Sequence, residues 1–422
     1  MTFQATRSFA TKLDREDPLV GFRAKFFIPR NSTGSEVLYF CGNSLGLQPR
    51  NSRALLEEEM LAWETLGVEG HFKENSPWVS YHELVREPIS KLVGALPSEV
   101  VSMNSLTVNL HLLFVSFYRP NAKRHKILIE GSAFPSDQYA VKSQLMYHGY
   151  DPRDALIEIF PRDGERILRM DDIVTKIEET GDSIAIVFIG GVNYSTGQVV
   201  DMKRITEAGH KAGCRVGFDL AHAIGNIPMN LHDWKVDFAV WCTYKYLNAG
   251  PGAIGGCFIH EQNCHDPAVP RFSGWWGHDK ASRFKMGPDF TPIPGAEGWQ
   301  LSNPSITSIA TLRSSLEIFD EVGVAKLRQK SQGLTSYMEF LIESLADPRV
   351  SIITPKNPLD RGCQLSIVVD GIGKKIFEKL MERGVICDWR EPDIIRVAPV
   401  PLYNTFEEVY KFYKIFKGLL LG

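Results

Sequence analysis

Short apolar runs alternate with amphipathic stretches through most of the chain. The runs are rich in β-branched and aromatic residues and read "HKILIEG", "DALIEIF", "SIAIVFIG", "CRVGFDL", "VDFAVWC" and "GGCFIHE". Between several of them, apolar positions recur at helical spacing, at residues 136–148, 170–179 and 202–212. Continuous apolar strands that alternate with helices indicate a mostly parallel sheet covered on both faces, and we expect it over about residues 60–300.

The pattern changes near residue 300. Long helical patterns at 306–319 and 324–345 are followed by short strand-like runs and a final helix from residue 406. The stretch "SNPS" separates the two regions, because Pro304 breaks regular structure there. We therefore predict an α/β fold: a large domain with a mostly parallel, seven-stranded sheet flanked by helices, plus a smaller α+β C-terminal domain. The expected divisions are 1–50 (packing on the small domain), 51–303 and 304–422.

Composition narrows the class of protein. Of the 422 residues, 44% are hydrophobic, and 47 basic residues balance 50 acidic ones, which argues against nucleic-acid or membrane partners. The N-terminal stretch has no apolar core and contains acidic residues, so it resembles neither a secretory signal nor a transit peptide. Seven cysteines form no CxxC pair, and Cys264-His265 has no partners at metal-ligand spacing. We expect reduced thiols, a cytoplasmic location and no metal.

Two familiar motifs need their context checked. Residues 250–255, "GPGAIG", match GxGxxG, but a strand-like run follows where a dinucleotide site needs a helix. Residues 42–46, "GNSLG", match the GxSxG of a nucleophile elbow, but Pro49 delays the helix that should begin after Ser44. We reject the first motif and favour a binding loop for the second. A serine hydrolase using Ser44 remains as an alternative.

An aspartate and a lysine each end one of two consecutive apolar strands. Asp219 closes "VGFD", and Lys245 follows "VDFAVWC" within "TYKYLNAGPG". A strand–helix–strand unit brings both residues to one edge of the sheet. A lysine forms a Schiff base with the aldehyde of pyridoxal phosphate, and an aspartate keeps its pyridinium nitrogen protonated. The pair therefore predicts a site for this cofactor.

The cofactor's phosphate and ring also need partners. "NSLTVNLH" predicts a loop that enters a helix at Leu106 and Thr107, and backbone N–H groups at a helix N-terminus favour phosphate. "FPSD" follows the strand "KILIEG", so that Phe134 is placed to stack on the ring and Asp137 to anchor the loop. Simple helix caps explain both stretches equally well when they are taken alone.

A family resemblance covers nearly the whole chain. The stretches "NSLGLQP", "NSLTVNLHLL", "AFPSDQYA", "VGFDLAHAIGN", "YKYLNAGPG", "RFKM", "SNPS", "RGCQL" and "IRVAPVPLYN" resemble, in this order, the kynureninase family. The resemblance implies an aspartate-aminotransferase-like fold and pyridoxal 5'-phosphate as cofactor. It also implies hydrolysis of L-kynurenine or 3-hydroxy-L-kynurenine to L-alanine and an anthranilate, in tryptophan catabolism or NAD biosynthesis.

The resemblance assigns roles to single residues. Lys245 would hold the cofactor, Asp219 would bind its ring nitrogen, and Tyr244 would reach its phosphate and serve in acid–base steps. The further cofactor contacts implied are Leu106, Thr107, Phe134, Pro135, Ser136, Asp137 and His222, with Trp275 and Asn303 from the other subunit of a homodimer. Gly190 stands where some relatives have serine, so a side-chain contact there is in question.

The substrate contacts are implied in the same way. Arg396 in "IRVAP" would bind the substrate carboxylate through its guanidinium. His71 and Asn303 would face the aryl ring, with Ser44 and Trp78 in the same pocket. A polar pair there suits the ring hydroxyl of 3-hydroxykynurenine.

Four rival functions remain at this point. An aminotransferase or a cysteine desulfurase of the same fold would use the same lysine and aspartate. A desulfurase also needs a reactive cysteine on a mobile loop, whereas Cys363 and Cys387 lie in strand-like sequence. A cofactor-free scaffold is the third possibility besides the serine hydrolase. The sequence leaves open which aryl ring is preferred.

Overall fold

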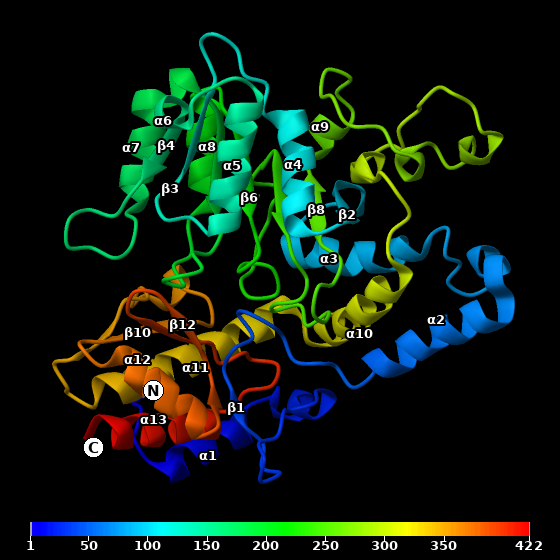
Figure 1. Cartoon of the computed structure of the whole chain (residues 1–422). Helices are drawn as coiled ribbons and strands as arrows, with labels where there is room; N and C mark the ends of the chain where they lie inside the picture. The colour runs from blue at the N-terminus through cyan, green and yellow to red at the C-terminus, as the bar shows by residue number, and fades with distance from the viewer. Residues whose placement is uncertain (1, 422) are drawn as a thin grey trace.

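The upper half of the molecule is built around one large sheet (Figure 1), which has seven strands. We describe residues 2–421 from a computed structural model. The strand order is β2-β8-β7-β6-β5-β3-β4. The bounds are β2 Val100–Ser102, β3 Lys126–Glu130, β4 Leu156–Ile159, β5 Ile184–Gly190, β6 Arg215–Asp219, β7 Phe238–Trp241 and β8 Gly256–Ile259. All pairings are parallel except those of β8, which is antiparallel to both neighbours. The predicted mostly parallel sheet is confirmed.

Helices cover both faces of this sheet, as its continuous apolar strands predicted. Ile127 and Ile129 of β3 face the core under α4 (Leu106–Phe117) and α5 (Pro135–Tyr147). Leu128 between them faces the opposite core, with α7 (Met170–Thr180) and α8 (Met202–Lys211). Successive side chains of a strand point to opposite faces, so a strand buried on both faces has no polar positions.

Close packing inside the sheet depends on one glycine. The ring of Phe238 stacks on Phe117 with centroids 4.8 Å apart. A Cβ added to Gly217, on the adjacent strand, would lie 2.2 Å from the Phe238 ring. Gly217 therefore leaves the space that the aromatic ring fills.

A smaller α+β unit forms the lower half of the molecule (Figure 1). Its antiparallel sheet has the order β12-β13-β10-β9, and β1 pairs in parallel with β11. The bounds are β1 Leu38–Tyr39, β9 Val350–Ile352, β10 Leu365–Val369, β11 Val385–Ile386, β12 Asp388–Arg390 and β13 Ile394–Val397. The α-helices of both halves that have not yet been named are α1 Arg7–Glu16, α2 Ser52–Leu66, α3 Arg86–Val93, α6 Pro152–Ala155, α9 Glu261–Cys264, α10 Ile306–Val322, α11 Val324–Glu343, α12 Gly373–Glu382 and α13 Phe406–Leu421.

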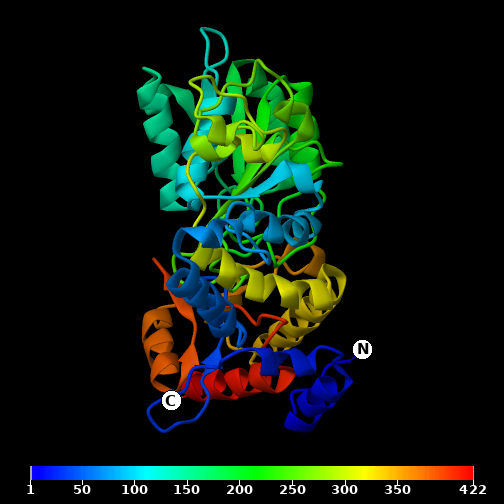
Figure 2. The ribbon, with the colours of Figure 1, turned by 90° about the vertical axis from the view of Figure 1, so that its right-hand side faces the viewer.

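The N-terminal segment lies against this smaller unit. Figure 2 shows α1 beside α13 at the base of the molecule. The carboxylate of Asp14 accepts the backbone N–H groups of Phe406 at 2.7 Å and Glu407 at 2.9 Å. Asp14 thus supplies acceptors for the free N–H groups at the start of α13.

The helix after residue 303 joins the two halves. Ile309, Leu312 and Leu316 of α10 are buried in the same core as the large sheet. The next helix, α11, contributes Leu334 and Leu341 to the core of the smaller unit. Both helices follow residue 303, but α10 packs in the core of the large sheet and α11 in the core of the smaller unit. The divisions at residues 50 and 303 therefore stay a prediction.

Candidate active site

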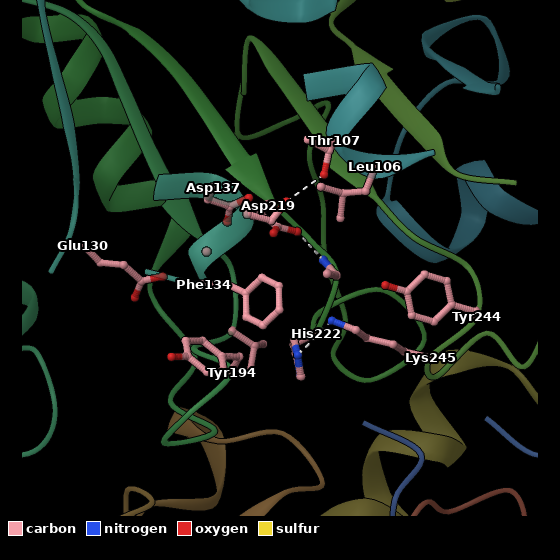
Figure 3. Close-up of a pocket in the computed structure, with 14 residues that line it drawn as sticks. Leu106, Thr107, Glu130, Phe134, Asp137, Tyr194, Asp219, His222, Tyr244 and Lys245 are labelled. Carbon is pink, nitrogen blue, oxygen red and sulfur yellow. Dashed lines mark hydrogen bonds between the residues drawn. The ribbon is translucent and has the colours of Figure 1, made fainter. Parts of the chain in front are cut away.

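A buried pocket lies where the parallel strands end. Its walls come from the ends of β3, β5 and β6, the first turns of α4 and α5, and the turn after β7 (Figure 3). Ligands bind at this edge in open α/β sheets, because the loops and helix N-termini converge there. The lining residues are Leu106, Thr107, Glu130, Phe134, Ser136, Asp137, Gly190, Val192, Tyr194, Asp219, Ala221, His222, Tyr244 and Lys245.

Two carboxyl groups face each other in the pocket. Asp219 ends β6 and accepts the Ala221 N–H at 2.7 Å, and Asp137 of α5 lies against it. Burial raises the pKa of Asp219, which the charge of Lys245 opposes. Burial and then the Asp219 charge raise the pKa of Asp137 well above its ordinary value. Such a pair is stabilised by a cation between or beside its oxygens.

This carboxyl pair fits a protonated pyridine nitrogen. Oδ1 of Asp137 is buried and makes no hydrogen bond within residues 2–421. An N–H⁺ group beside Asp219 would compensate both buried carboxyls and lower their pKa values. The donor set therefore suits the ring nitrogen of pyridoxal phosphate.

Lys245 is held on the other side of the pocket. Its Nζ lies 3.0 Å from Nε2 of His222 and 5.7 Å from the centroid of the Phe134 ring. Burial, and then the charge of Lys245, lower the pKa of His222 well below its ordinary value. A neutral imidazole can accept a hydrogen bond from the lysine amine, so the contact orients Nζ within the pocket.

The "GNSLG" loop packs against the backbone of the turn that carries Lys245. The N–H of Gly46 donates to the Tyr244 carbonyl at 2.8 Å. A Cβ on Gly46 would lie 2.3 Å from the Lys245 carbonyl oxygen and 2.8 Å from Cα of Asn248. The second glycine of this motif therefore permits backbone packing against the lysine turn.

Two helix N-termini open into the pocket. Ser105, the N-cap of α4, makes no side-chain cap bond within the described chain, and neither does Phe134 at the start of α5. The Thr107 and Ser136 hydroxyls are 2.7 Å apart and join the two helices. Free backbone N–H groups and a hydroxyl pair suit a phosphate, so the predicted phosphate loop fits the structure.

Aromatic rings enclose the pocket. The Phe134 and Tyr194 rings meet edge to face with centroids 5.2 Å apart. Burial, and then neighbouring Cys242, raise the pKa of Tyr244, so its hydroxyl stays protonated at neutral pH. The sequence analysis overlooked Tyr194, Val192 and Glu130. A signal for Glu130 existed, because it ends a parallel strand in the same way as Asp219 does.

Arg396 and Ser44 meet beside this pocket, in a cluster that includes Asp388. Arg396 is 1% exposed, and its Nε donates to Oδ1 of Asp388 at 2.6 Å. One terminal nitrogen contacts Oδ2 of Asp388 and Oγ of Ser44, and the other donates to the Tyr194 carbonyl at 2.7 Å. The shared residue Tyr194 places this cluster at the pocket wall. Ser44 therefore belongs to a charged cluster.

The other predicted site residues lie apart from the pocket in this chain. The rings of His71 and Trp78 meet edge to face at 5.3 Å. Trp275 is 45% exposed and lines a separate depression with His278 and Phe290. Neither these residues nor Asn303 are among the lining residues that the described chain contributes.

The rejected and rival motifs have clear structural contexts. Gly250 and Gly252 adopt positive φ angles in a turn, and β8 follows directly, so the GxGxxG match does not open a helix. Burial raises the pKa of Cys363 to about 12, and it also raises the pKa of Cys387. Thiols of this kind are poor nucleophiles, unlike the cysteine that a desulfurase needs.

Two acid–histidine clusters lie elsewhere, and protein donors occupy their ligand atoms. Oε1 of Glu99 accepts the Glu261 N–H at 2.8 Å and contacts Nδ1 of His232 at 3.0 Å. Oε2 of Glu297 accepts from Nζ of Lys280 at 3.0 Å. Across residues 2–421, no helix is both long and apolar enough to cross a membrane.

Structural comparison identifies the fold. The chain is similar to the cysteine desulfurase CsdA from Escherichia coli, with a TM-score of 0.77 and 17% identity over 95% of this chain and 98% of that chain. It is also similar to the apo cysteine desulfurase of Thermococcus onnurineus, with a TM-score of 0.75 and 17% identity over 92% and 95% of the two chains. At this level of identity the likeness establishes the shared fold and leaves the reaction open.

Sequence comparison is more specific. The chain is 58% identical to a kynureninase from Koribacter versatilis over 98% of both chains. It is 56% identical to a kynureninase from Myxococcus xanthus, over 99% of this chain and 98% of the relative. A family model described as the kynureninase C-terminal domain matches residues 327–416. With such identity over its whole length, the chain belongs to the kynureninase family.

Proposed function

We propose that the pocket around Lys245 is the active site at which this kynureninase-family protein works. The protein is a pyridoxal-phosphate-dependent hydrolase that cleaves the Cβ–Cγ bond of L-kynurenine or 3-hydroxy-L-kynurenine. The observation that carries the assignment is the meeting of Asp219 and Lys245 in one buried pocket, from the ends of two adjacent strands.

The cofactor contacts follow from the contents of the pocket. Lys245 would hold the aldehyde carbon, Asp219 the ring nitrogen and Phe134 the ring face. The N-termini of α4 and α5 would hold the phosphate. The residues proposed to bind it are Leu106, Thr107, Pro135, Ser136, Asp137, His222 and Tyr244 within the chain, with Trp275 and Asn303 from a second subunit.

Two of the proton transfers are assigned to residues of this chain. Bound pyridoxal phosphate supplies an electron sink for negative charge at Cα and Cβ of the substrate. The amine of Lys245, freed when the substrate amine takes its place, removes the Cα proton. Water adds to the γ-carbonyl, the Cβ–Cγ bond breaks with its electron pair left on Cβ, and Cγ departs with its aryl group as a carboxylic acid. Tyr244 is the proposed proton donor to Cβ, because it lines the pocket directly beside Lys245.

Arg396 is the proposed partner of the substrate carboxylate. Asp388 takes the edge of the guanidinium formed by Nε and one terminal nitrogen. The terminal nitrogens also donate to the Tyr194 carbonyl and the Ser44 hydroxyl, and the substrate carboxylate would replace these two contacts with paired hydrogen bonds of its own.

We propose a homodimer in which a second chain completes each site. Trp63 and Phe72, in and after α2, are 64% and 62% exposed, and the Phe72 ring lies 6.1 Å from that of Phe284. Exposed aromatic residues that gather in this way are typical of protein interfaces. A second copy seated there would bring Trp275 toward the site. The unpaired cysteines favour a cytoplasmic location.

The aryl pocket is proposed to contain His71, Asn303, Ser44 and Trp78. A histidine and an amide suit the ring hydroxyl of 3-hydroxykynurenine, and a site built to bind that hydroxyl is penalised by its loss. The test compares kcat/KM for release of anthranilate and 3-hydroxyanthranilate, first with the unmodified protein and then with His71→Trp. We expect kcat/KM to be higher for 3-hydroxykynurenine than for kynurenine. His71→Trp should reduce the ratio of these two kcat/KM values at least tenfold. Equal values in the unmodified protein would contradict the hydroxyl-binding role.

A further inference from the structure

Glu130 lines the active-site pocket and has no role in the reaction described above. It is the last residue of β3, 5% exposed, and its Oε2 accepts Nδ2 of Asn193 at 2.9 Å. The backbone N–H of Gly190 is its other donor. Both donors are uncharged, so the carboxyl is buried at the cofactor pocket without a cationic partner among its hydrogen bonds.

The space that Glu130 occupies is left by Gly190. A Cβ on Gly190 would lie 2.8 Å from Oε1 of Glu130. Gly190 ends β5 directly beside Asp219 in the sheet. A side chain at position 190 and the Glu130 carboxyl would therefore compete for one place on the pocket wall. In this chain the carboxyl takes it.

The carboxyl retains much of its proton near neutral pH. Burial raises the pKa of Glu130 to about 7, against the effects of Asn193 and Gly190, and the charge of Asp219 adds to the increase. A protonated carboxyl has one hydroxyl donor in addition to its acceptors. With Asn193 and Gly190 supplying donors to the oxygens, the acidic proton is available to a ligand in the pocket.

The order of substituents around the pyridine ring of the cofactor indicates which of its groups would lie nearest Glu130. Asp219 and Lys245 fix the axis from the ring nitrogen to the aldehyde carbon. The phosphate arm and the 3-hydroxyl lie on opposite sides of this axis. Figure 3 shows Leu106, Thr107 and Tyr244 on one side of Phe134, and Glu130 on the other. With the phosphate at α4, the 3-oxygen side of the ring faces Glu130 and Gly190.

We propose that Glu130 is a cofactor-binding residue whose carboxyl, in the space left by Gly190, donates a hydrogen bond to the 3-oxygen of bound pyridoxal phosphate. The inference rests on the proposed attachment at Lys245. The carboxyl then occupies the space that a side chain at position 190 would take. Asn193 then acts as a positioning residue, because it holds the carboxyl toward the ring.

The test measures cofactor retention and the absorbance spectrum of the holoenzyme. Glu130→Ala removes the donor, and we expect pyridoxal phosphate to bind about five- to tenfold more weakly, as for one lost hydrogen bond. The absorbance of the bound cofactor should shift as well, because the 3-oxygen is part of its conjugated system. Glu130→Gln keeps a donor of similar shape and should bind within about twofold of the unmodified protein.

A double variant provides the sharpest comparison. Glu130→Ala with Gly190→Ser places a hydroxyl in the vacated space, and we expect it to recover most of the lost affinity. Glu158→Ala removes a carboxylate on the neighbouring strand β4, outside the pocket, and should change neither readout. Thermal unfolding of the cofactor-free proteins distinguishes loss of a cofactor contact from a purely structural effect. A purely structural effect would lower the melting temperature without shifting the absorbance of the bound cofactor.

Unchanged affinity and spectrum in Glu130→Ala would overturn the inference, as would an equal loss in Glu130→Ala and Glu130→Gln. Borohydride reduction followed by mass spectrometry tests the underlying assignment separately. A label on Lys245 in every variant supports the attachment site, whatever Glu130 does. No label on Lys245 in the unmodified protein would reject the proposed function itself.

Discussion

Asp388 holds the guanidinium of Arg396 through both of its carboxylate oxygens. Burial raises the pKa of Asp388, but the hydrogen bond and charge of Arg396 outweigh this and lower it. The pair therefore stays ionised, and it fixes one edge of an arginine that is almost completely buried. Asp388 thus orients the arginine that we propose binds the substrate carboxylate.

Asp388→Asn should raise KM for the substrate about tenfold or more, because the amide cannot replace a charge-assisted bidentate contact. Binding of pyridoxal phosphate should not change. Steady-state kinetics and cofactor titration check both expectations. Ser44→Ala removes one hydrogen bond to Asp388 and one from Arg396 but leaves the paired contact between those two residues, so it should have a smaller effect on KM. A lower KM in Asp388→Asn would mean that Asp388 competes with the substrate for Arg396.

Lys245→Ala should abolish turnover and the covalent attachment of the cofactor, because it removes the amine that holds the aldehyde. Lys245→Arg is the matched variant, since it keeps a positive charge beside His222 but supplies no nucleophile. Both should give no labelled peptide after borohydride reduction. A variant that keeps normal activity would overturn the assignment of Lys245.

Gly46→Ala should reduce activity by disturbing the lysine turn. The added methyl would lie 2.3 Å from the Lys245 carbonyl oxygen and 2.8 Å from Cα of Asn248, so backbone has to move. Overpacking of this kind costs about 1–3 kcal/mol. Gly21→Ala is the control, because a Cβ there meets nothing within 4 Å. Thermal unfolding and kcat measure the effect, and equal behaviour of the two variants would contradict the packing argument.

Stability should fall in acid through Glu297. Burial raises the pKa of this carboxyl, but contacts with His82 and Lys280 outweigh burial and lower its pKa to about 2. Because the folded pKa lies below the unfolded one, the stabilisation is complete above about pH 4.5 and is lost as the pH falls toward 2.

The shift at Glu297 corresponds to about 2–3 kcal/mol at neutral pH. Glu297→Gln should lower the melting temperature at pH 7 and flatten its decline between about pH 5 and pH 3. Calorimetry over this range provides the measurement. Identical pH profiles for the two proteins would exclude Glu297 as a source of acid sensitivity.

The proposed dimer predicts complementation between two inactive variants. Lys245→Ala lacks the attachment residue, and Trp275→Ala lacks the residue proposed to come from the partner. Refolding the two together should give mixed dimers with one intact site and recover part of the activity. Trp63→Asp places a charge on the exposed face of α2 and should shift sedimentation toward monomer. No recovery, with unchanged sedimentation, would count against a shared site.

The sequence by itself determined the large sheet and the two residues at the centre of its site, Asp219 and Lys245. Short apolar runs rich in β-branched and aromatic residues fit strands buried on both faces, so the parallel sheet and its helices followed from local patterning. The placement of Asp219 and Lys245 followed from the same logic, since parallel strands bring their carboxyl ends together. Leu106, Thr107, Phe134 and Asp137 could be placed because helix starts after strands point to the same edge.

Contacts between distant segments required the tertiary structure. Asp388 and Arg396 are paired on adjacent strands of the small sheet, but Ser44 reaches them only through the packing of the N-terminal loop, and Glu130 enters the pocket because Gly190 leaves room on an adjacent strand. No periodicity encodes such meetings, because they depend on which side chains share one volume after the chain has folded. Local pattern decides which elements form, and three-dimensional packing decides which of their side chains touch.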